Sequence, residues 1–246
     1  MEIRICKTSA ALGESAAKYV AKRLNDIIAE KGYARIVLST GASQFETLDA
    51  LTRENVNWSV VDMFHLDEYV NLPITHMASF RKYLQERFVD RLPMPLRSVN
   101  FVDGTPEGIA QITKKLREDE IDIGLIGIGE NTHIAFNDPP ADFNTKDAYI
   151  IVNLDDNCKR QQMGGGWFAT IDDVPKQAVS MTTYQIMQCK EIVSCVPYAV
   201  KANAISKTLK TKETTPNVPA TLLKEHSNFI LYIDSDSAKD VINFEF

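Results

Sequence analysis

Two kinds of segment alternate along this chain, and their alternation restricts the fold more than any other feature of the sequence. The runs RIVL (35–38), IDIGLI (121–126) and EIVSCV (191–196) are short and largely apolar, as strands buried on both faces of a sheet are. Stretches with helical spacing of apolar residues separate them, such as 11–30. We therefore expect an α/β fold: a single Rossmann-like domain over 1–246, with a mainly parallel sheet and helices on both faces.

The 246 residues are enough to bury the core of one large domain. We expect strands at 35–38, 58–64, 121–126, 149–152, 191–196 and 229–233, and helices near 11–30, 44–53, 76–88, 105–118, 182–188, 197–209 and 235–242. The segment 155–176, with three consecutive glycines at 164–166, is expected to be irregular. It is interpreted either as a lid or as an exposed connection held in place by Trp167.

Charge and cysteine content exclude several classes of protein. The net charge of −6 provides no general basic face for nucleic acid. No apolar run approaches the length of a membrane span, and the first twenty residues lack the pattern of a signal peptide. The four cysteines show no CxxC spacing, which argues against a zinc site or a redox pair. We expect a cytoplasmic protein with free thiols, no membrane and no nucleic-acid partner.

Ligands of open parallel sheets bind at the carboxyl ends of the strands, so the residues that follow each expected strand are the candidate site. After RIVL come Ser39, Thr40, Gly41, Ala42 and Ser43, which precede a helix. Hydroxyls and backbone N–H groups at such a position can hold an anion. The alternative is an ordinary helix cap by Thr40 or Ser43.

After the second strand, Asp67 and Glu68 place two adjacent carboxylates at the sheet edge. They are candidates for a general base and its neighbour, or they form a solvated charged loop. A metal site would need more histidines and carboxylates than His65 provides nearby.

The third strand end carries GIGENTHIAFNDPP at 127–140, with His133 at its centre. An imidazole transfers protons near neutral pH, and Asp138 or Glu130 can hold its second ring nitrogen. The alternative is a structural histidine bonded to the backbone. After the fourth strand, Lys201 opens a helix, where a cation is unfavourable unless an anion offsets it. Arg160 is a candidate to join it, although either residue alone fits an ordinary surface.

Four stretches together resemble the glucosamine-6-phosphate deaminase (isomerase) family, which shares its fold with the 6-phosphogluconolactonases: LSTGASQ at 38–44, FHLDEYVNLPITHMASFRKYL at 64–84, GIGENTHIAFNDPP at 127–140 and KANA at 201–204. Deaminases resemble this chain in having Asp-Glu-Tyr and then Leu-Pro after the second strand, whereas lactonases have Asp-Glu-Arg. The resemblance favours the deaminase branch.

That resemblance implies an enzyme of amino-sugar metabolism that converts glucosamine 6-phosphate, or its galactosamine epimer, to a ketose 6-phosphate and ammonia. It implies no metal and no organic cofactor. Asp67 matches the base at C2, His133 the acid/base that opens the ring, and Asp138 the acidic residue that assists it. Residues matching the substrate and phosphate site are Ser39, Thr40, Gly41, Ala42, Ser43, Glu68, Gly129, Arg160 and Lys201.

Two residues depart from the family pattern, because Asn131 and Thr132 stand where the family usually has aspartate and glycine. An amide can bond the imidazole but cannot stabilise an imidazolium by charge. The basic stretch of allosterically regulated relatives is not visible at 147–152, so no allosteric activation is expected. A lactonase-like hydrolase and a non-catalytic sugar-phosphate binding protein remain as alternatives. Relatives assemble as monomers, trimers or hexamers. The residues do not predict whether this chain is a monomer or a homo-oligomer.

Overall fold

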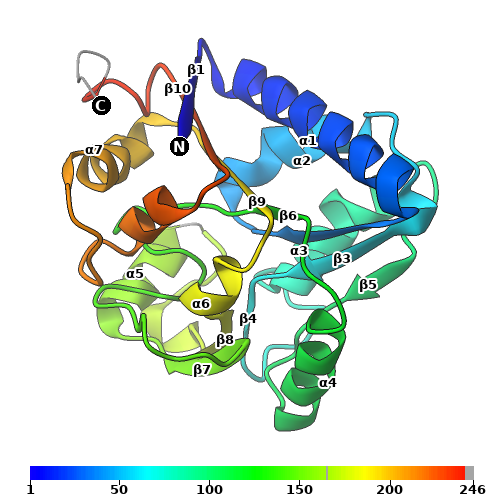
Figure 1. Cartoon of the computed structure of the whole chain (residues 1–246). Helices are drawn as coiled ribbons and strands as arrows, with labels where there is room; N and C mark the ends of the chain where they lie inside the picture. The colour runs from blue at the N-terminus through cyan, green and yellow to red at the C-terminus, as the bar shows by residue number, and fades with distance from the viewer. Residues whose placement is uncertain (165, 242–246) are drawn as a thin grey trace.

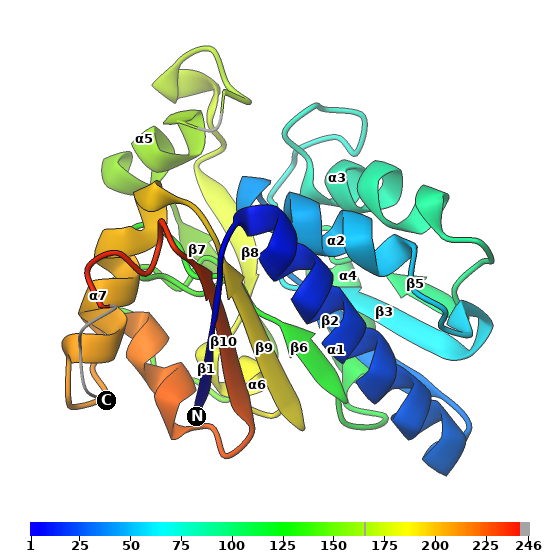
Figure 2. The same ribbon diagram turned by 90° about the horizontal axis from the view of Figure 1, so that it is seen from above.

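The computed structural model describes residues 1–164 and 166–241. Within them, seven parallel strands form one sheet in the order β1-β10-β9-β6-β2-β3-β5 (Figures 1 and 2). The strands are β1 (Glu2–Cys6), β2 (Ala34–Leu38), β3 (Val61–His65), β5 (Ser98–Asn100), β6 (Ile123–Leu125), β9 (Glu191–Val196) and β10 (Phe229–Asp234). A second, antiparallel sheet contains β4 (Asp67–Tyr69), β8 (Gln177–Met181) and β7 (Tyr149–Asn153).

Helices cover both faces of the parallel sheet, as the alternation predicts (Figures 1 and 2). Alternate residues of a strand point to opposite faces. Ile36 and Leu38 of β2 therefore pack with α1, α2 and α3, while Val37 packs with α4, α6 and α7. The helices are α1 (Ser9–Lys31), α2 (Phe45–Thr52), α3 (Phe80–Arg87), α4 (Pro106–Leu116), α5 (Asp156–Gly164), α6 (Thr183–Ile186) and α7 (Ala202–Lys210). Short 3₁₀ turns occupy Ala42–Gln44, Trp58–Val60, Val89–Arg91, Ile171–Asp173, Ala199–Lys201 and Pro219–Glu225.

Local sequence signals explain where the longest helix begins and ends. The side chain of Thr8 accepts a hydrogen bond from the backbone N–H of Ala11 at 3.2 Å and caps the first turn of α1. Gly32 ends the helix with a φ of 83°, a left-handed conformation that glycine adopts without steric cost.

Two predictions of secondary structure are wrong. The segment 155–176 is not irregular throughout, because it contains α5 and the turn Ile171–Asp173; the middle glycine at 165 lies outside the described residues. Cys158 and Phe168 are buried with Tyr69 of β4, so packing against the small sheet orders this polar segment. The helix expected at 235–242 is a series of turns over 235–241, and residue 242 lies outside the described residues.

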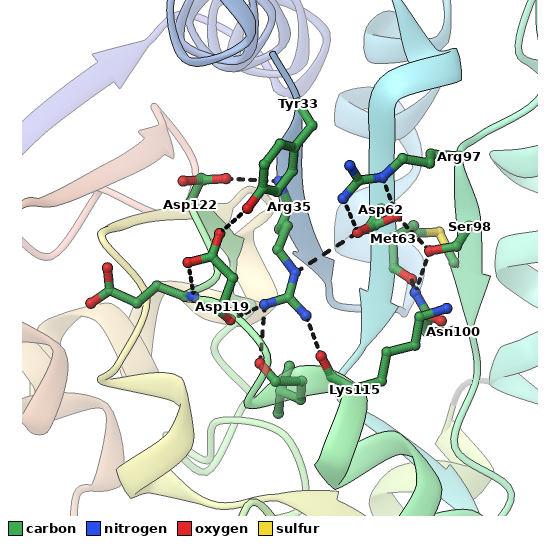
Figure 3. Close-up of polar contacts among 12 residues, drawn as sticks. Tyr33, Arg35, Asp62, Met63, Arg97, Ser98, Asn100, Lys115, Asp119 and Asp122 are labelled. Carbon is green, nitrogen blue, oxygen red and sulfur yellow. Dashed lines mark hydrogen bonds and ion pairs between the residues drawn. The ribbon is translucent and has the colours of Figure 1, made fainter. Parts of the chain in front are cut away.

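A buried polar network fixes the amino ends of the central strands (Figure 3). Arg35 of β2 is 2% exposed, and its guanidinium donates to the carbonyls of Lys115 and Leu116 at 2.6 and 3.1 Å, where α4 ends. Its backbone N–H donates to the carboxylate of Asp122 at 2.8 Å. The Asp62 carboxylate of β3 lies 3.9 Å from the same guanidinium and also pairs with Arg97, which is more exposed. This network lies at the opposite end of the strands from the candidate site.

Among the residues that the structure describes, no helix has both the length and the apolar character needed to cross a lipid bilayer.

Candidate active site

One cavity of about 700 Å³ opens at the carboxyl ends of the central parallel strands. Segments that follow β2, β3, β6 and β9 line it, and α5 contributes from the side. These strands are neighbours in the sheet, so segments far apart in the sequence meet at one edge. The lining includes the predicted residues Ser39, Thr40, Gly41, Ala42, Ser43, Asp67, Gly129, His133, Arg160 and Lys201.

The loop after β2 has the character of an anion cradle. Neither Thr40 nor Ser43 caps the following turn or helix, so the ordinary-cap alternative does not describe this loop. Ser39 is 6% exposed, and its hydroxyl has no hydrogen-bond partner among the described residues. A buried hydroxyl without a partner is costly unless a ligand supplies one. The phenol of Tyr83 donates to the carbonyl of Gly41 at 2.9 Å and fixes the loop against α3.

Asp67 begins β4 and faces the cavity, although it is only 8% exposed. Burial raises the pKa of its carboxyl to about 8, and the nearby carboxylates of Glu68 and Asp138 raise it further in the same direction. A carboxyl group with a pKa near the working pH is a suitable general base, because it exchanges a proton readily with a carbon acid.

Glu68 does not share that position, and its assignment to the substrate site requires correction. Its side chain is fully buried, and it is absent from the cavity lining. The carboxylate accepts hydrogen bonds from the Ser79 hydroxyl at 2.7 Å and from the backbone N–H of Arg81 at 2.9 Å, and it pairs with the Arg81 guanidinium at 3.1 Å. Glu68 therefore holds the first turn of α3, where a negative charge is favourable.

His133 lines the cavity with a carboxylate behind it. Its Nδ1 lies 3.1 Å from Oδ1 of Asp138, so Asp138 rather than Glu130 holds the second ring nitrogen. Although burial opposes ionisation of Asp138, the hydrogen bonds from His133 and Asn131 keep its pKa below the usual range. An ionised partner fixes the imidazole and stabilises its protonated form. The structural-histidine alternative does not account for this pair at a cavity wall.

Asn131 acts on the same carboxylate rather than on the imidazole ring. Its amide donates to Asp138 at 2.7 Å, and its carbonyl oxygen accepts from the backbone N–H of His133 at 3.1 Å. Neither Asn131 nor Asp138 lines the cavity. Both are positioning residues in this geometry, and the uncharged Asn131 supplies the bond that keeps Asp138 in place.

Lys201 and Arg160 bring positive charge to the cavity from two elements. Lys201 lies at the start of α7, and burial lowers the pKa of its ammonium group while Glu130 opposes the shift. The exposed Arg160 on α5 contacts the Asn157 side chain at 3.2 Å and Asp156 at 3.9 Å. A partly buried cation at a helix start is the arrangement that an anionic ligand would stabilise.

Residues 7–231 match the family model described as glucosamine-6-phosphate isomerases/6-phosphogluconolactonase. The chain belongs to this family. Its curated relatives include glucosamine-6-phosphate deaminases of Staphylococcus epidermidis (34% identical; 91% of this chain and 94% of the relative) and Clostridium acetobutylicum (32% identical; 90% and 94%).

Solved structures of the same family share the fold. A structure described as a monomeric glucosamine-6-phosphate deaminase superposes with a TM-score of 0.88 at 27% identity, over 98% of this chain and all of that one. A 6-phosphogluconolactonase from Thermotoga maritima superposes with a TM-score of 0.77 at 16% identity, over 95% of this chain and 99% of that one, which shows the fold alone.

The conformation of the histidine loop at position 132 favours glycine, the residue that the resemblance implies there. Thr132 has a φ of 75°, a left-handed conformation that a β-branched residue adopts only with strain. The loop is closed by the backbone N–H of Gly129, which donates to the carbonyl of His133 at 2.8 Å, and by the N–H of Thr132, which donates to the carbonyl of Gly129 at 3.0 Å. This member of the family therefore keeps the loop conformation despite the unfavourable residue.

We expect Gly129→Ala to lower kcat about 10²-fold while the protein stays folded. A Cβ at position 129 would lie 2.3 Å from Cε1 of His133, so the ring would have to move, and misplacement of a reacting group by about 1 Å costs activity of this order. Steady-state kinetics and thermal denaturation measure the two effects. The comparison variant is Gly127→Ala, which adds a methyl group at the same cavity wall in looser contacts, 3.3 Å from Nε2 of Gln44 and 3.5 Å from Oγ of Ser39. Full activity of Gly129→Ala would contradict the catalytic position of the ring.

Several residues that line the cavity were not predicted from the sequence. Tyr198 is the second residue after β9, so the strand-end rule could have found it; its phenol donates to the Glu46 carboxylate at 2.5 Å. Other lining residues also lie in segments that follow strands, namely Leu66, Gly127, Ile128, Glu130, Ala135, Phe136 and Val200. The remaining ones give no local signal, because they lie within helices or in the segment after α5. They include Phe45, Phe80, Arg87, Gln161, Gln162 and Trp167.

Proposed function

We propose that this family member is a glucosamine-6-phosphate deaminase, which converts its substrate and water to a ketose 6-phosphate and ammonia. One observation carries the proposal: the buried carboxyl of Asp67 and the carboxylate-backed imidazole of His133 line the same cavity as the anion cradle 39–43. The relatives that bear this name at 32–34% identity over nine-tenths of the chain support it.

The proposed chemistry begins with ring opening. His133 moves a proton between the O1 hydroxyl and the ring oxygen, and Asp138 stabilises the imidazolium that forms. Asp67 then removes the proton from C2 while the carbonyl oxygen O1 gains a proton, which gives an enolamine. Asp67 returns its proton to C1 and the nitrogen loses one, so that C2 becomes an imine carbon. Water adds to this carbon, the C–N bond breaks, and ammonia leaves with the proton that balances the step. Every step uses groups of this chain, its substrate and water.

The cradle and the cations position the substrate for these steps. Backbone N–H groups of the 39–43 loop, Lys201 and Arg160 would hold the 6-phosphate, so that C1 and C2 of the open chain face Asp67 and His133. The unpartnered hydroxyl of Ser39 is available to donate to a ligand oxygen.

The test is release of ammonia and ketose phosphate from purified protein, with glucosamine 6-phosphate and galactosamine 6-phosphate measured side by side. We expect turnover with the glucosamine epimer as the better substrate. Hydrolysis of 6-phosphogluconolactone in its place would identify a lactonase, and sugar-phosphate binding without any product would identify a binding protein. Either of these results would overturn the proposal.

Three related expectations belong to the same proposal. The match of one family model to residues 7–231 supports a single domain. The four cysteines are free, which supports a cytoplasmic location. The segment 155–176, which brings Arg160 and Trp167 to the cavity, remains our candidate for a lid.

A further inference from the structure

We propose that Arg87 is a third cationic ligand of the substrate's phosphate, in addition to Lys201 and Arg160. The inference rests on the proposed function for the identity of the anion. Arg87 is the last residue of α3, and it lines the mouth of the same cavity as the cradle. Among the described residues no carboxylate forms an ion pair with its guanidinium, whereas the neighbouring Arg91 pairs with Asp49.

Aromatic rings hold this guanidinium at the cavity. The guanidinium carbon of Arg87 lies 4.0 Å from the ring centroid of Phe45 and 5.6 Å from that of Tyr83. The two rings stack with their centroids 5.7 Å apart. A cation held over aromatic faces keeps its N–H edge free, because stacking uses the face of the planar group. Arg87 is therefore oriented without any of its donors being committed to a carboxylate.

The same residues connect Arg87 to the anion cradle. Phe45 is the first residue of α2 and lies two residues after the end of the cradle, while the phenol of Tyr83 donates to the carbonyl of Gly41. Tyr83 and Arg87 are four residues apart on α3, so they lie on one face of that helix. The other end of α3 is fixed by Glu68, the neighbour of the proposed base. Helix α3 therefore joins the proposed catalytic centre to the cradle.

The placement of the cations around the cavity fits a doubly charged anion. Helices α5 and α3 lie apart, on the left and the right of Figure 2, with α2 beside α3. Arg160 and Arg87 line the cavity from these two different helices, and Lys201 lies half-buried at the start of α7. Only two carboxyl groups line the described cavity, those of Asp67 and Glu130. A phosphate dianion would balance the excess positive charge.

The experiment compares Arg87→Gln with the wild-type protein by calorimetric titration of inorganic phosphate and of glucose 6-phosphate, which lacks the amino group. Glutamine keeps a planar group over Phe45 and removes the charge. We expect both ligands to bind about tenfold more weakly. In the catalysed reaction the KM for glucosamine 6-phosphate rises by a similar factor, while kcat stays within about twofold.

Two further variants separate binding from folding. Arg87→Lys keeps the charge without the bidentate geometry, so it recovers part of the lost affinity. Arg53→Met removes an exposed arginine that pairs with Asp49 outside the cavity, and it binds both ligands as the wild type does. Wild-type affinity of Arg87→Gln for both ligands would overturn the assignment, as would a loss that Arg87→Lys does not recover at all.

The readouts also separate this inference from the proposed function. Weakened phosphate binding in Arg87→Gln, in a protein whose wild type releases no ammonia, would retain the role of Arg87 and reject the deaminase. Normal ammonia release with an unchanged KM in Arg87→Gln would retain the deaminase and reject the role of Arg87.

Discussion

Replacement of Asp67 by asparagine is expected to lower kcat about 10³-fold and to change sugar-phosphate affinity by no more than a few fold. The amide has nearly the same shape but cannot accept the proton from C2, and a positioned general base contributes 10²–10⁴-fold to the rate. Ammonia release measures the loss, and exchange of the C2 proton with deuterated solvent assigns it to this step. Undiminished exchange in Asp67→Asn would contradict the role of Asp67.

The same carboxyl group predicts the pH dependence. A base must be ionised to act, so kcat/KM is expected to fall as the pH drops below about 8, the pKa to which burial raises Asp67. The stability of the fold depends on pH in the opposite direction. The fold favours the protonated carboxyl of Asp67, so the stabilisation from this group is complete below its ordinary pKa of 3.8 and is lost as the pH rises through about 8.

Asp67→Asn removes this ionisation from the folded state. We therefore expect the variant to be more stable than the wild type by about 2 kcal/mol at pH 9, with a smaller difference at pH 5. Urea denaturation at the two pH values measures the difference. Asp236→Asn is the matched control, because Asp236 is exposed and lies outside the cavity lining; it should change both activity and stability only slightly. A stability gain of Asp67→Asn over the wild type that is no larger at pH 9 than at pH 5 would contradict the raised pKa.

Arg35→Met is expected to lower the free energy of unfolding by about 3–5 kcal/mol, the usual cost of breaking a buried charged network from one side. The substitution leaves the carbonyls of Lys115 and Leu116 without their donor and removes a cation from Asp62 (Figure 3). Urea denaturation gives the loss. Because Arg35 lies at the amino ends of the strands, kcat of the folded fraction should remain unchanged.

Arg97→Met is the control for Arg35. Arg97 pairs with the same Asp62 carboxylate through a bond of 2.9 Å, but its side chain is 39% exposed. Water takes the place of this exposed guanidinium at the Asp62 carboxylate, so a cost of about 1 kcal/mol is expected. Equal losses from the two variants would show that the buried bonds of Arg35 to the end of α4 contribute little.

The sequence by itself determined the class of fold and most of the proposed site. Strand β9 was predicted with the observed bounds, because the largely apolar run EIVSCV lies between Lys190 and Pro197. The strand-end rule then located Asp67, His133 and the 39–43 loop, since the carboxyl ends of neighbouring parallel strands meet at one edge. Strands β1, β4, β5 and β8 escaped prediction; β4 and β5 have only three residues each.

Only the tertiary structure decided what each polar side chain does there. Asp67 and Glu68 are adjacent in sequence, yet alternation along β4 directs one to the cavity and the other to the start of α3. The choice of Asp138 over Glu130 as the partner of His133 depends on the path of a loop, and the raised pKa of Asp67 depends on burial by distant segments. Arg87 has no local signal, because its place follows from how α3 packs against α2. Local pattern fixes which residues reach the edge of a sheet, whereas packing between distant segments fixes their distances, charges and partners.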